Sequence, residues 1–254
     1  MTDRPTTAAV VRALFLETTF GRLWYAGAVA STMRWLESLA VGVFVFDLTG
    51  SAIMVAVFLF LRWAPLVLFG AWFGVIADRI SRKSIQFVGL AAMSATSAIL
   101  GVLIIFEAAS MWHIGAGAFL SGVFTSTDYS TRRAMVGDAA GLDRVGVAMA
   151  FDTGTNNGTR MLGPALGGFL LEFMGLHGAY MLGAVFYASA AYAILRMPYY
   201  QARPAGPPPK VFANLVEGFL YARNEPIVVG VLSITVIVNA FGFPFASVLP
   251  VIGR

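Results

Sequence analysis

The sequence contains no cysteine and few charged side chains. Only 12% of its 254 residues are charged, and it has two histidines, whereas about a quarter of the residues of an average soluble domain are charged. The missing cysteines exclude disulfide scaffolds, thiolate metal sites and cysteine nucleophiles. His113 and His177 stand far apart in short breaks between apolar runs. We therefore expect loop histidines and no metal site.

Motifs of common enzymes are missing as well. The sequence has no G-x-x-x-x-G-K-[ST] phosphate loop, no nucleophile elbow and no H-E-x-x-H pair, so we expect neither an enzyme nor a cofactor. It is rich in apolar residues instead, with 58% hydrophobic residues and a mean hydropathy of +0.78. A soluble fold of this size could not bury so much apolar surface. The composition predicts a protein of the lipid bilayer.

Seven apolar runs are long enough to cross roughly 30 Å of hydrocarbon, which takes about 20 helical residues. They are 22–46, 52–77, 85–106, 112–131, 146–171, 177–196 and 226–250. The first residues of the chain are too polar and too interrupted for a cleaved signal peptide, so the first run is expected to remain as a span. The sequence thus predicts an all-α, multi-pass membrane protein.

Lysine and arginine fall on one side of these predicted spans. The other connections contain only acids, Asp47, Glu107 and Glu172. Because basic connections stay inside, we expect a cytoplasmic N-terminus in the cell membrane. The isoelectric point of 9.6 then reflects topology, and we expect no nucleic-acid partner. The basic residues on the inner side are Arg4, Arg12, Arg22, Arg79, Arg82, Lys83, Arg132, Arg133, Arg144, Arg196, Arg203, Lys210 and Arg223.

A proline-rich stretch, RPAGPPPK at 203–210, favours an extended linker that no helix can cross. It predicts a division into a transmembrane bundle at 1–196, a cytoplasmic linker at 197–225 and a further span within 226–254. Inside the linker, the apolar residues of VFANLVEGFLYARN share one helical face, which predicts an amphipathic helix on the membrane surface or against the bundle.

One short connection, GVIADRISRK, places an acid among three bases between two apolar runs. Bases here suit an ordinary positive-inside anchor that also favours the negative end of the preceding helix, but this interpretation leaves the acid unexplained. The connection resembles the G-x-x-x-D-R-x-G-R-K loop of the major facilitator superfamily at the same place in the topology. The residues that carry the resemblance are Gly74, Asp78, Arg79, Arg82 and Lys83. Ser81 replaces the second glycine, which predicts a less tight turn.

The resemblance implies the fold of this superfamily, in which two six-helix halves form a transporter. The chain would supply the N-terminal six-helix bundle, the linker and the seventh helix, and its partner would be the C-terminal six-helix half. The resemblance also implies that Asp78 and the motif arginines latch against that second half. Without it, the chain would not alternate between inward-open and outward-open states.

A second resemblance lies in the fifth predicted span. Proline and glycine there allow a bend and close helix approach, and an ordinary small-residue packing face is the alternative. Gly163, Pro164, Gly167 and Gly168 resemble the G-P-x-x-G-G end of the superfamily's antiporter motif, although Ala150 and Thr159 replace its earlier glycines. The stretch 127–168 is similar to a bacterial subgroup with enterobactin exporters and macrolide-efflux-like permeases. In that subgroup, Arg132, Arg133 and Asp138 would lie in a cytoplasmic loop.

Charges inside spans indicate a transport pathway, because each costs about 2.5–3.5 kcal/mol at a helix centre. The candidates for substrate or ion coupling are Arg34, Glu37, Arg62 and Arg160. Arg34 and Glu37 share a helix face and are expected to pair, either structurally or as part of the pathway. Asp128 and Asp152 are expected to cap helices or to latch onto Arg132. A proton carried by Glu37 is a further hypothesis.

The excess of arginine in this set favours an anionic or amphipathic small molecule as substrate. Together, these patterns predict a secondary active transporter, or a fragment of one, that exports its substrate by alternating access with ion coupling, most simply to protons. The alternative is a half-transporter without transport activity, which acts as a structural or regulatory partner in the membrane.

Overall fold

The structure is a computed structural model. It describes residues 7–201, 221 and 223–242, without the side chains of 7–8, of 71–79 and of part of the last helix. Every regular element in these ranges is an α-helix. The helices are α1 (Thr7–Leu16), α2 (Thr18–Thr49), α3 (Ala52–Arg79), α4 (Arg82–Ile105), α5 (Met111–Ala140), α6 (Val145–Leu195) and α8 (Pro226–Gly242). Helix is expected in so apolar a chain, because a helix satisfies its own backbone groups where no water is present.

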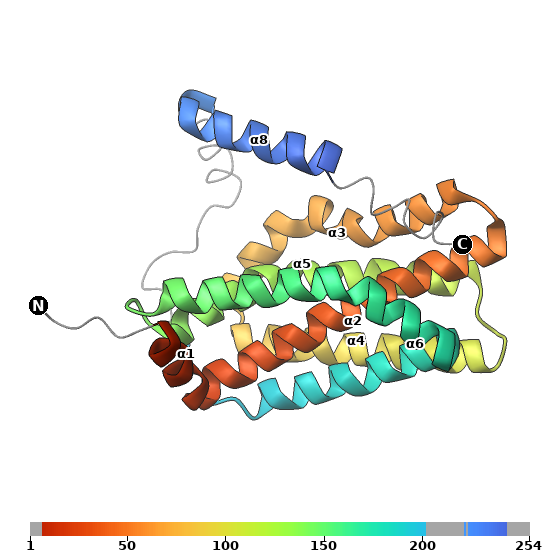
Figure 1. Ribbon diagram of the computed structural model, residues 1–254, viewed down its shortest axis with the longest axis horizontal. Helices are drawn as coiled ribbons and strands as arrows, with labels where there is room; N and C mark the ends of the chain where they lie inside the picture. The colour runs from red at the N-terminus through yellow and green to blue at the C-terminus, as the bar shows by residue number, and fades with distance from the viewer. Residues whose placement is uncertain (1–6, 202–220, 222, 243–254) are drawn as a thin grey trace, which may run out of the picture.

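Each predicted run coincides with a helix, and two of them share α6. Gly175 interrupts this helix with φ 65° and ψ −178°, a conformation that glycine adopts without steric cost. Figure 1 shows the chain reversing direction in α6, so that its two parts form a helical hairpin. The runs 146–171 and 177–196 are therefore separate helical segments, as predicted.

Four helices in the described ranges are long and apolar enough to cross a membrane. They are α2, the Ala52–Gly70 part of α3, α4 and α6. The 30 residues of α5 would reach across, but this helix carries more polar and charged side chains. Most of the predicted amphipathic helix at 211–224 and the last part of the run 226–250 lie outside the described residues. Figure 1 shows α8 apart from the bundle, on the side of α3.

Close packing of α2 against α6 depends on two glycines. A Cβ on Gly163 would lie 2.6 Å from Cβ of Trp35, and one on Gly167 would lie 3.2 Å from a methyl group of Leu39. Glycines four residues apart therefore let the two backbones approach. On the other side of the bundle, Gly122 lets α5 approach α3, since a Cβ there would overlap the Arg62 carbonyl oxygen.

The interior has two apolar cores with a charged layer between them. The core that we call the apolar end lies near the α2–α3 and α4–α5 connections and contains Ala40, Val41, Val45, Val55, Phe58, Leu100, Ile114 and Tyr180. The second core lies at the opposite end and includes Leu14, Phe20, Leu23, Met135, Tyr187 and Ile194. Side chains between the two cores come from α2, α3, α5 and α6, and they form the candidate site.

Candidate functional site

Among the described residues, six charged side chains are buried between the two cores, and we call them the charged layer. Each is at most 9% exposed. They are Arg34 and Glu37 on α2, Arg62 on α3, Asp128 and Arg132 on α5, and Asp152 on α6. Three arginines therefore face three carboxylates. The excess of positive charge inferred from the sequence is not present in this layer, because Asp128 and Asp152 lie deeper than expected.

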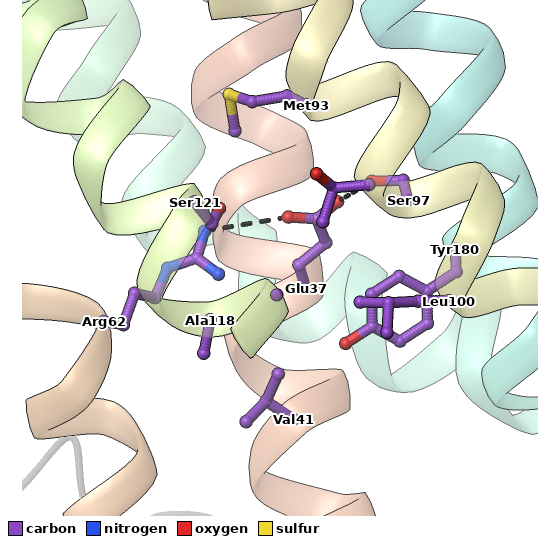
Figure 2. A pocket seen from close by; sticks show the side chains of 11 residues that line it. Glu37, Val41, Arg62, Met93, Ser97, Leu100, Ala118, Ser121 and Tyr180 are labelled. Carbon is purple, nitrogen blue, oxygen red and sulfur yellow. Dashed lines mark hydrogen bonds and ion pairs between the residues drawn. The ribbon is translucent and has the colours of Figure 1, made fainter. Parts of the chain in front are cut away.

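Glu37 forms its ion pair with Arg62, not with Arg34. The Arg62 Nη2 atom lies 3.7 Å from Glu37 Oε2 and also donates a hydrogen bond of 3.3 Å to the Arg34 carbonyl oxygen. Ser97 donates to Glu37 Oε1 at 2.6 Å, and Tyr187 donates to Oε2 at 3.3 Å. Figure 2 shows Arg62 and Ser97 reaching Glu37 from different helices. The predicted pairing of Arg34 with Glu37 is wrong, because Arg62 brings a better-placed charge from α3.

Arg34 pairs with Asp128 on α5, at 3.3 Å between Nη2 and Oδ2. The same carboxylate lies 3.6 Å from Arg132 Nε and accepts a hydrogen bond of 2.5 Å from Gln86 on α4. Arg132 reaches onward to Asp152 on α6 through its Nη1 atom. A chain of buried ion pairs thus joins α2, α5 and α6.

This chain confirms the expected latch between Arg132 and the two aspartates. It corrects the expectation that Arg132, Arg133 and Asp138 lie in a loop, because all three belong to α5. Gly27 on α2 provides the space for Arg132, since a Cβ there would lie 2.5 Å from the guanidinium Nη1. The sequence shows many glycines in the predicted spans. Only the fold shows that Gly27 is the one that faces Arg132.

Arg160, the remaining candidate for substrate or ion coupling, is less buried than the six residues of the charged layer. It is half-buried on α6, with its guanidinium carbon 5.7 Å from the Trp35 ring centroid, a cation–π distance. On the same helix, Asn156 Oδ1 accepts a hydrogen bond of 2.7 Å from Ser31 on α2, and the Thr159 hydroxyl lies 2.6 Å from the Ser31 hydroxyl in a second one. This polar face contains none of the six residues of the charged layer.

The structure describes the side chains of only part of the motif between α3 and α4. The backbones of Gly74, Asp78 and Arg79 end α3, and their side chains lie outside the described residues. Arg82 forms an ion pair of 2.9 Å with Asp138. Lys83 donates to the Met197 carbonyl oxygen at 2.7 Å. Ser81 caps α4 by accepting a hydrogen bond from the Ser84 N–H group, which gives this serine a structural role in place of a tight glycine turn.

The segment that leaves α6 is held against the ends of α2, α4 and α5. Tyr199 donates a hydrogen bond of 2.5 Å to Asp138, Gln201 accepts one of 2.8 Å from the Arg82 N–H group, and Thr19 donates to the Pro198 carbonyl at 3.0 Å. Partial burial, together with the bond to Asp138, raises the pKa of Tyr199 to about 12. The first residues of the predicted linker are therefore part of the bundle.

The glycine–proline motif lies on α6, where it packs against α2. Pro164 falls inside the helix, and Gly163 and Gly167 make the close approach to α2. Gly168 has no atom within 4 Å of an added Cβ. Packing thus accounts for two of the three glycines. Histidine also differs from expectation, because His113 lies within the first turn of α5 and forms a capping box with Ser110.

Two small cavities adjoin the charged layer. The first contains Glu37, Arg62, Ser97 and Ser121 in its lining, and the second contains Arg34, Gln86 and Asp128; each measures about 10 Å³. Figure 2 shows Glu37 between Arg62 and Ser97 in the first cavity. Charged groups in apolar helices, close to internal cavities, are typical of transport pathways.

Comparison with known proteins identifies the family. The family model for transmembrane secretion effectors matches residues 10–254. The chain belongs to this family of the major facilitator superfamily. The curated relatives described below are 21–23% identical to the chain. The chain spans about half the length of the curated relatives that it matches, with 50–58% of each covered.

The curated relatives carry the names of transporters. An uncharacterized MFS-type transporter, YfiS, of Bacillus subtilis is 23% identical over 82% of the chain and 50% of its own length. The staphyloferrin A transporter of Staphylococcus aureus is 23% identical over 86% of the chain and 55% of its own length. Macrolide efflux protein A of Streptococcus pyogenes is 21% identical over 92% of the chain and 58% of its own length.

Proposed function

We propose that the chain forms the first half of a secondary active transporter that exports a small amphipathic molecule by alternating access. The observation that carries the proposal is the charged layer, in which six buried ionisable groups pair across four helices of an apolar bundle. Buried ion pairs stabilise a fold weakly in comparison with apolar packing. Such a layer in membrane helices is better explained by a role in transport.

Efflux is the direction that one relative favours by its name, macrolide efflux protein A. The staphyloferrin A transporter supports transport of a small molecule without indicating a direction. These names do not favour the alternative of a non-transporting structural partner. The second six-helix half, which the superfamily resemblance implies, would complete the cavity. Asp78 and the neighbouring arginines would then latch the two halves on the cytoplasmic side.

Ion coupling is proposed at Glu37. Its carboxylate holds Arg62 on α3, Ser97 on α4 and Tyr187 on α6. Protonation would remove the negative charge and leave only hydrogen bonds between these helices. A proton at this one position therefore changes how α2 is held to three neighbours, which is the kind of bistable contact that alternating access requires.

The cargo is proposed to be amphipathic, without a preference for anions. The sequence favoured an anion because arginines outnumbered acids in the predicted spans. In the charged layer, three arginines are balanced by three carboxylates, so this argument no longer holds. Arg160 above Trp35, with the Ser31, Asn156 and Thr159 hydrogen bonds beside it, offers an aromatic and polar face. Such a face suits a ligand that has both an apolar body and hydrogen-bonding groups.

The decisive experiment is efflux from cells that lack their own pumps and express the complete gene product containing this chain. The panel would contain a macrolide, staphyloferrin A, a cationic dye and an acidic dye. Glu37→Gln should abolish efflux that depends on the pH gradient at unchanged protein level, and Glu107→Gln, in the exposed α4–α5 connection, is the matched control. No Glu37-dependent export of any panel compound would contradict the proposal.

Orientation is testable in the same cells with a membrane-impermeant thiol reagent, since the chain has no cysteine of its own. A cytoplasmic N-terminus places Glu107 outside and the α5–α6 connection inside. Glu107→Cys should be labelled in intact cells, and Leu142→Cys, which replaces a side chain that is 95% exposed, only after permeabilisation. The reverse pattern would overturn the orientation.

A further inference from the structure

The side chain of Met93 separates the two cavities of the charged layer. Met93 on α4 is 6% exposed and is the one residue that lines both. The cavity on one side contains Glu37, and the cavity on the other side contains Asp128. Figure 2 shows Met93 and Val41 on opposite sides of the Glu37 cavity. A single flexible side chain therefore stands between two buried carboxylates.

Each cavity has a buried polar atom without a hydrogen-bond partner in its lining. Ser121, which is 6% exposed, lines the Glu37 cavity, and its Oγ atom has no hydrogen-bond partner among the described residues. Arg34, also 6% exposed, lines the Asp128 cavity, and within the same part of the chain its Nε atom has no hydrogen-bond partner. A buried polar group without a partner costs about 1–3 kcal/mol, so a small polar ligand that satisfies it is favoured.

The volume of each cavity fits one water molecule. A buried water requires about 10–15 Å³ of such space and two to four polar partners, and each cavity measures about 10 Å³. The first offers Ser121, Glu37, Arg62 and Ser97, and the second offers Arg34, Asp128 and Gln86. Both therefore have the space and the partners to bind water.

We propose that the two cavities are ordered-water sites on a proton path between Asp128 and Glu37, which the Met93 side chain interrupts. The importance of this path for transport rests on the proposed ion coupling at Glu37. Whether water occupies the two sites and carries protons to Glu37 can be measured in the bundle without a transport assay.

The groups that surround Glu37 do not themselves supply a proton, so the proton reaches Glu37 through the cavity. Arg62 on α3 and Ser97 on α4 contact the carboxylate directly, as does Tyr187 on α6. The other titratable groups near it are Arg34 on its own helix and Tyr180 on α6, while α5 contributes the Ser121 hydroxyl. Arginine and tyrosine keep their protons at neutral pH.

The transfer step moves one proton. A hydrated proton in the Ser121 cavity loses an O–H bond as a new O–H bond forms on the Glu37 carboxylate, and the donor returns to neutral water. The carboxylate loses its charge and its ion pair, while Arg62 retains its hydrogen bond to the Arg34 carbonyl oxygen. Methionine is unbranched, with three rotatable bonds, so a rotation of Met93 joins the two waters.

Infrared spectroscopy of the full chain in lipid nanodiscs tests the path. The C=O band of protonated Glu37 is identified by its loss in Glu37→Gln, and its shift after transfer to D₂O measures proton exchange. Ser121→Val fills the cavity and removes the hydroxyl, so exchange should slow about tenfold, equivalent to about 1.4 kcal/mol on a barrier. Met93→Ala opens the separation between the cavities and should accelerate exchange several-fold.

Ser126→Ala is the matched control, because Ser126 is a buried serine on the same helix that donates to the Gly122 carbonyl and lines neither cavity. It should exchange at the wild-type rate. A Glu37 band with equal exchange in all three variants would overturn the path and leave the proposed transport and coupling intact. No Glu37 band at any accessible pH would overturn the path and the coupling together, but not export itself, which the efflux assay measures.

Discussion

The charged layer and the apolar end lie next to each other in the same bundle and hold their helices by different means. At the apolar end, side chains such as Val45 and Ile114 are fully buried and contribute through loss of contact with water and through packing. In the charged layer, Glu37 and Asp128 each contact three polar side chains, and Asp152 pairs with Arg132. Apolar packing is insensitive to pH and ligands, whereas ion pairs are rearranged by one proton or one charged ligand. In a transporter of this design, helices would change their contacts in the charged layer and keep them at the apolar end.

The largest effect on stability is expected at Arg132. Arg132→Ala would leave the carboxylates of Asp128 and Asp152 buried without their shared cation. We expect the free energy of unfolding to fall by about 3–5 kcal/mol, the usual cost of breaking a buried pair on one side. Thermal unfolding in detergent measures it. Arg133→Ala, at the exposed neighbouring position, is the control, and equal losses in both variants would show that the buried pairing contributes nothing specific.

A truncation at the apolar end is expected to cost somewhat less. Ile114→Ala removes a fully buried side chain and leaves a cavity, at a cost of about 3 kcal/mol. The loss should be the same at every pH between about 5 and 8, because the described core of the apolar end contains no Asp, Glu or His side chain. Unfolding measured across this range checks the claim. A pH-dependent loss would break the distinction between the two regions.

The α2–α6 contact offers a smaller effect with a built-in control. Gly163→Ala would place a methyl group 2.6 Å from Trp35 Cβ, an atom next to the backbone that cannot swing away. Overpacking of this kind should cost about 2 kcal/mol. Gly168→Ala meets nothing within 4 Å and should raise the free energy of unfolding by up to about 1 kcal/mol through helix propensity. Similar values for the two variants would contradict the packing role of Gly163.

The smallest effect concerns Tyr199, outside the buried layer. Tyr199→Phe removes the hydrogen bond to Asp138, at a cost of about 1 kcal/mol. The pKa of Tyr199 is raised to about 12 from its ordinary value of 10.0, so the protonated phenol favours the folded state. Its contribution should be complete below pH 10 and should disappear as the pH rises through about 12. Unfolding of both proteins across this range tests it, and a constant difference at high pH would disprove the assignment.

The positions of the helices followed from the sequence, and the pairing of charges did not. Apolar runs and the break before His177 located each helix, because backbone groups in a membrane must bond within their own segment. The spacing of Arg34 and Glu37 on one helix suggested the wrong pair, since local spacing takes no account of side chains from other helices. Asp128 and Arg132 appeared to lie near a loop, although α5 continues to Ala140 and buries both.

By itself, the sequence determined that this is an all-α protein of the membrane, and its motif residues placed it in the major facilitator superfamily. Composition and run length are sufficient for the first conclusion, because the bilayer admits few backbone structures. Only the tertiary structure decided that Glu37 meets Arg62 and that Arg34 meets Asp128. It also revealed that Met93 lines two cavities, one beside Glu37 and one beside Asp128. These contacts join residues far apart in the chain, and they depend on glycines such as Gly27 and Gly122 that let particular helices approach closely enough for one partner and not another.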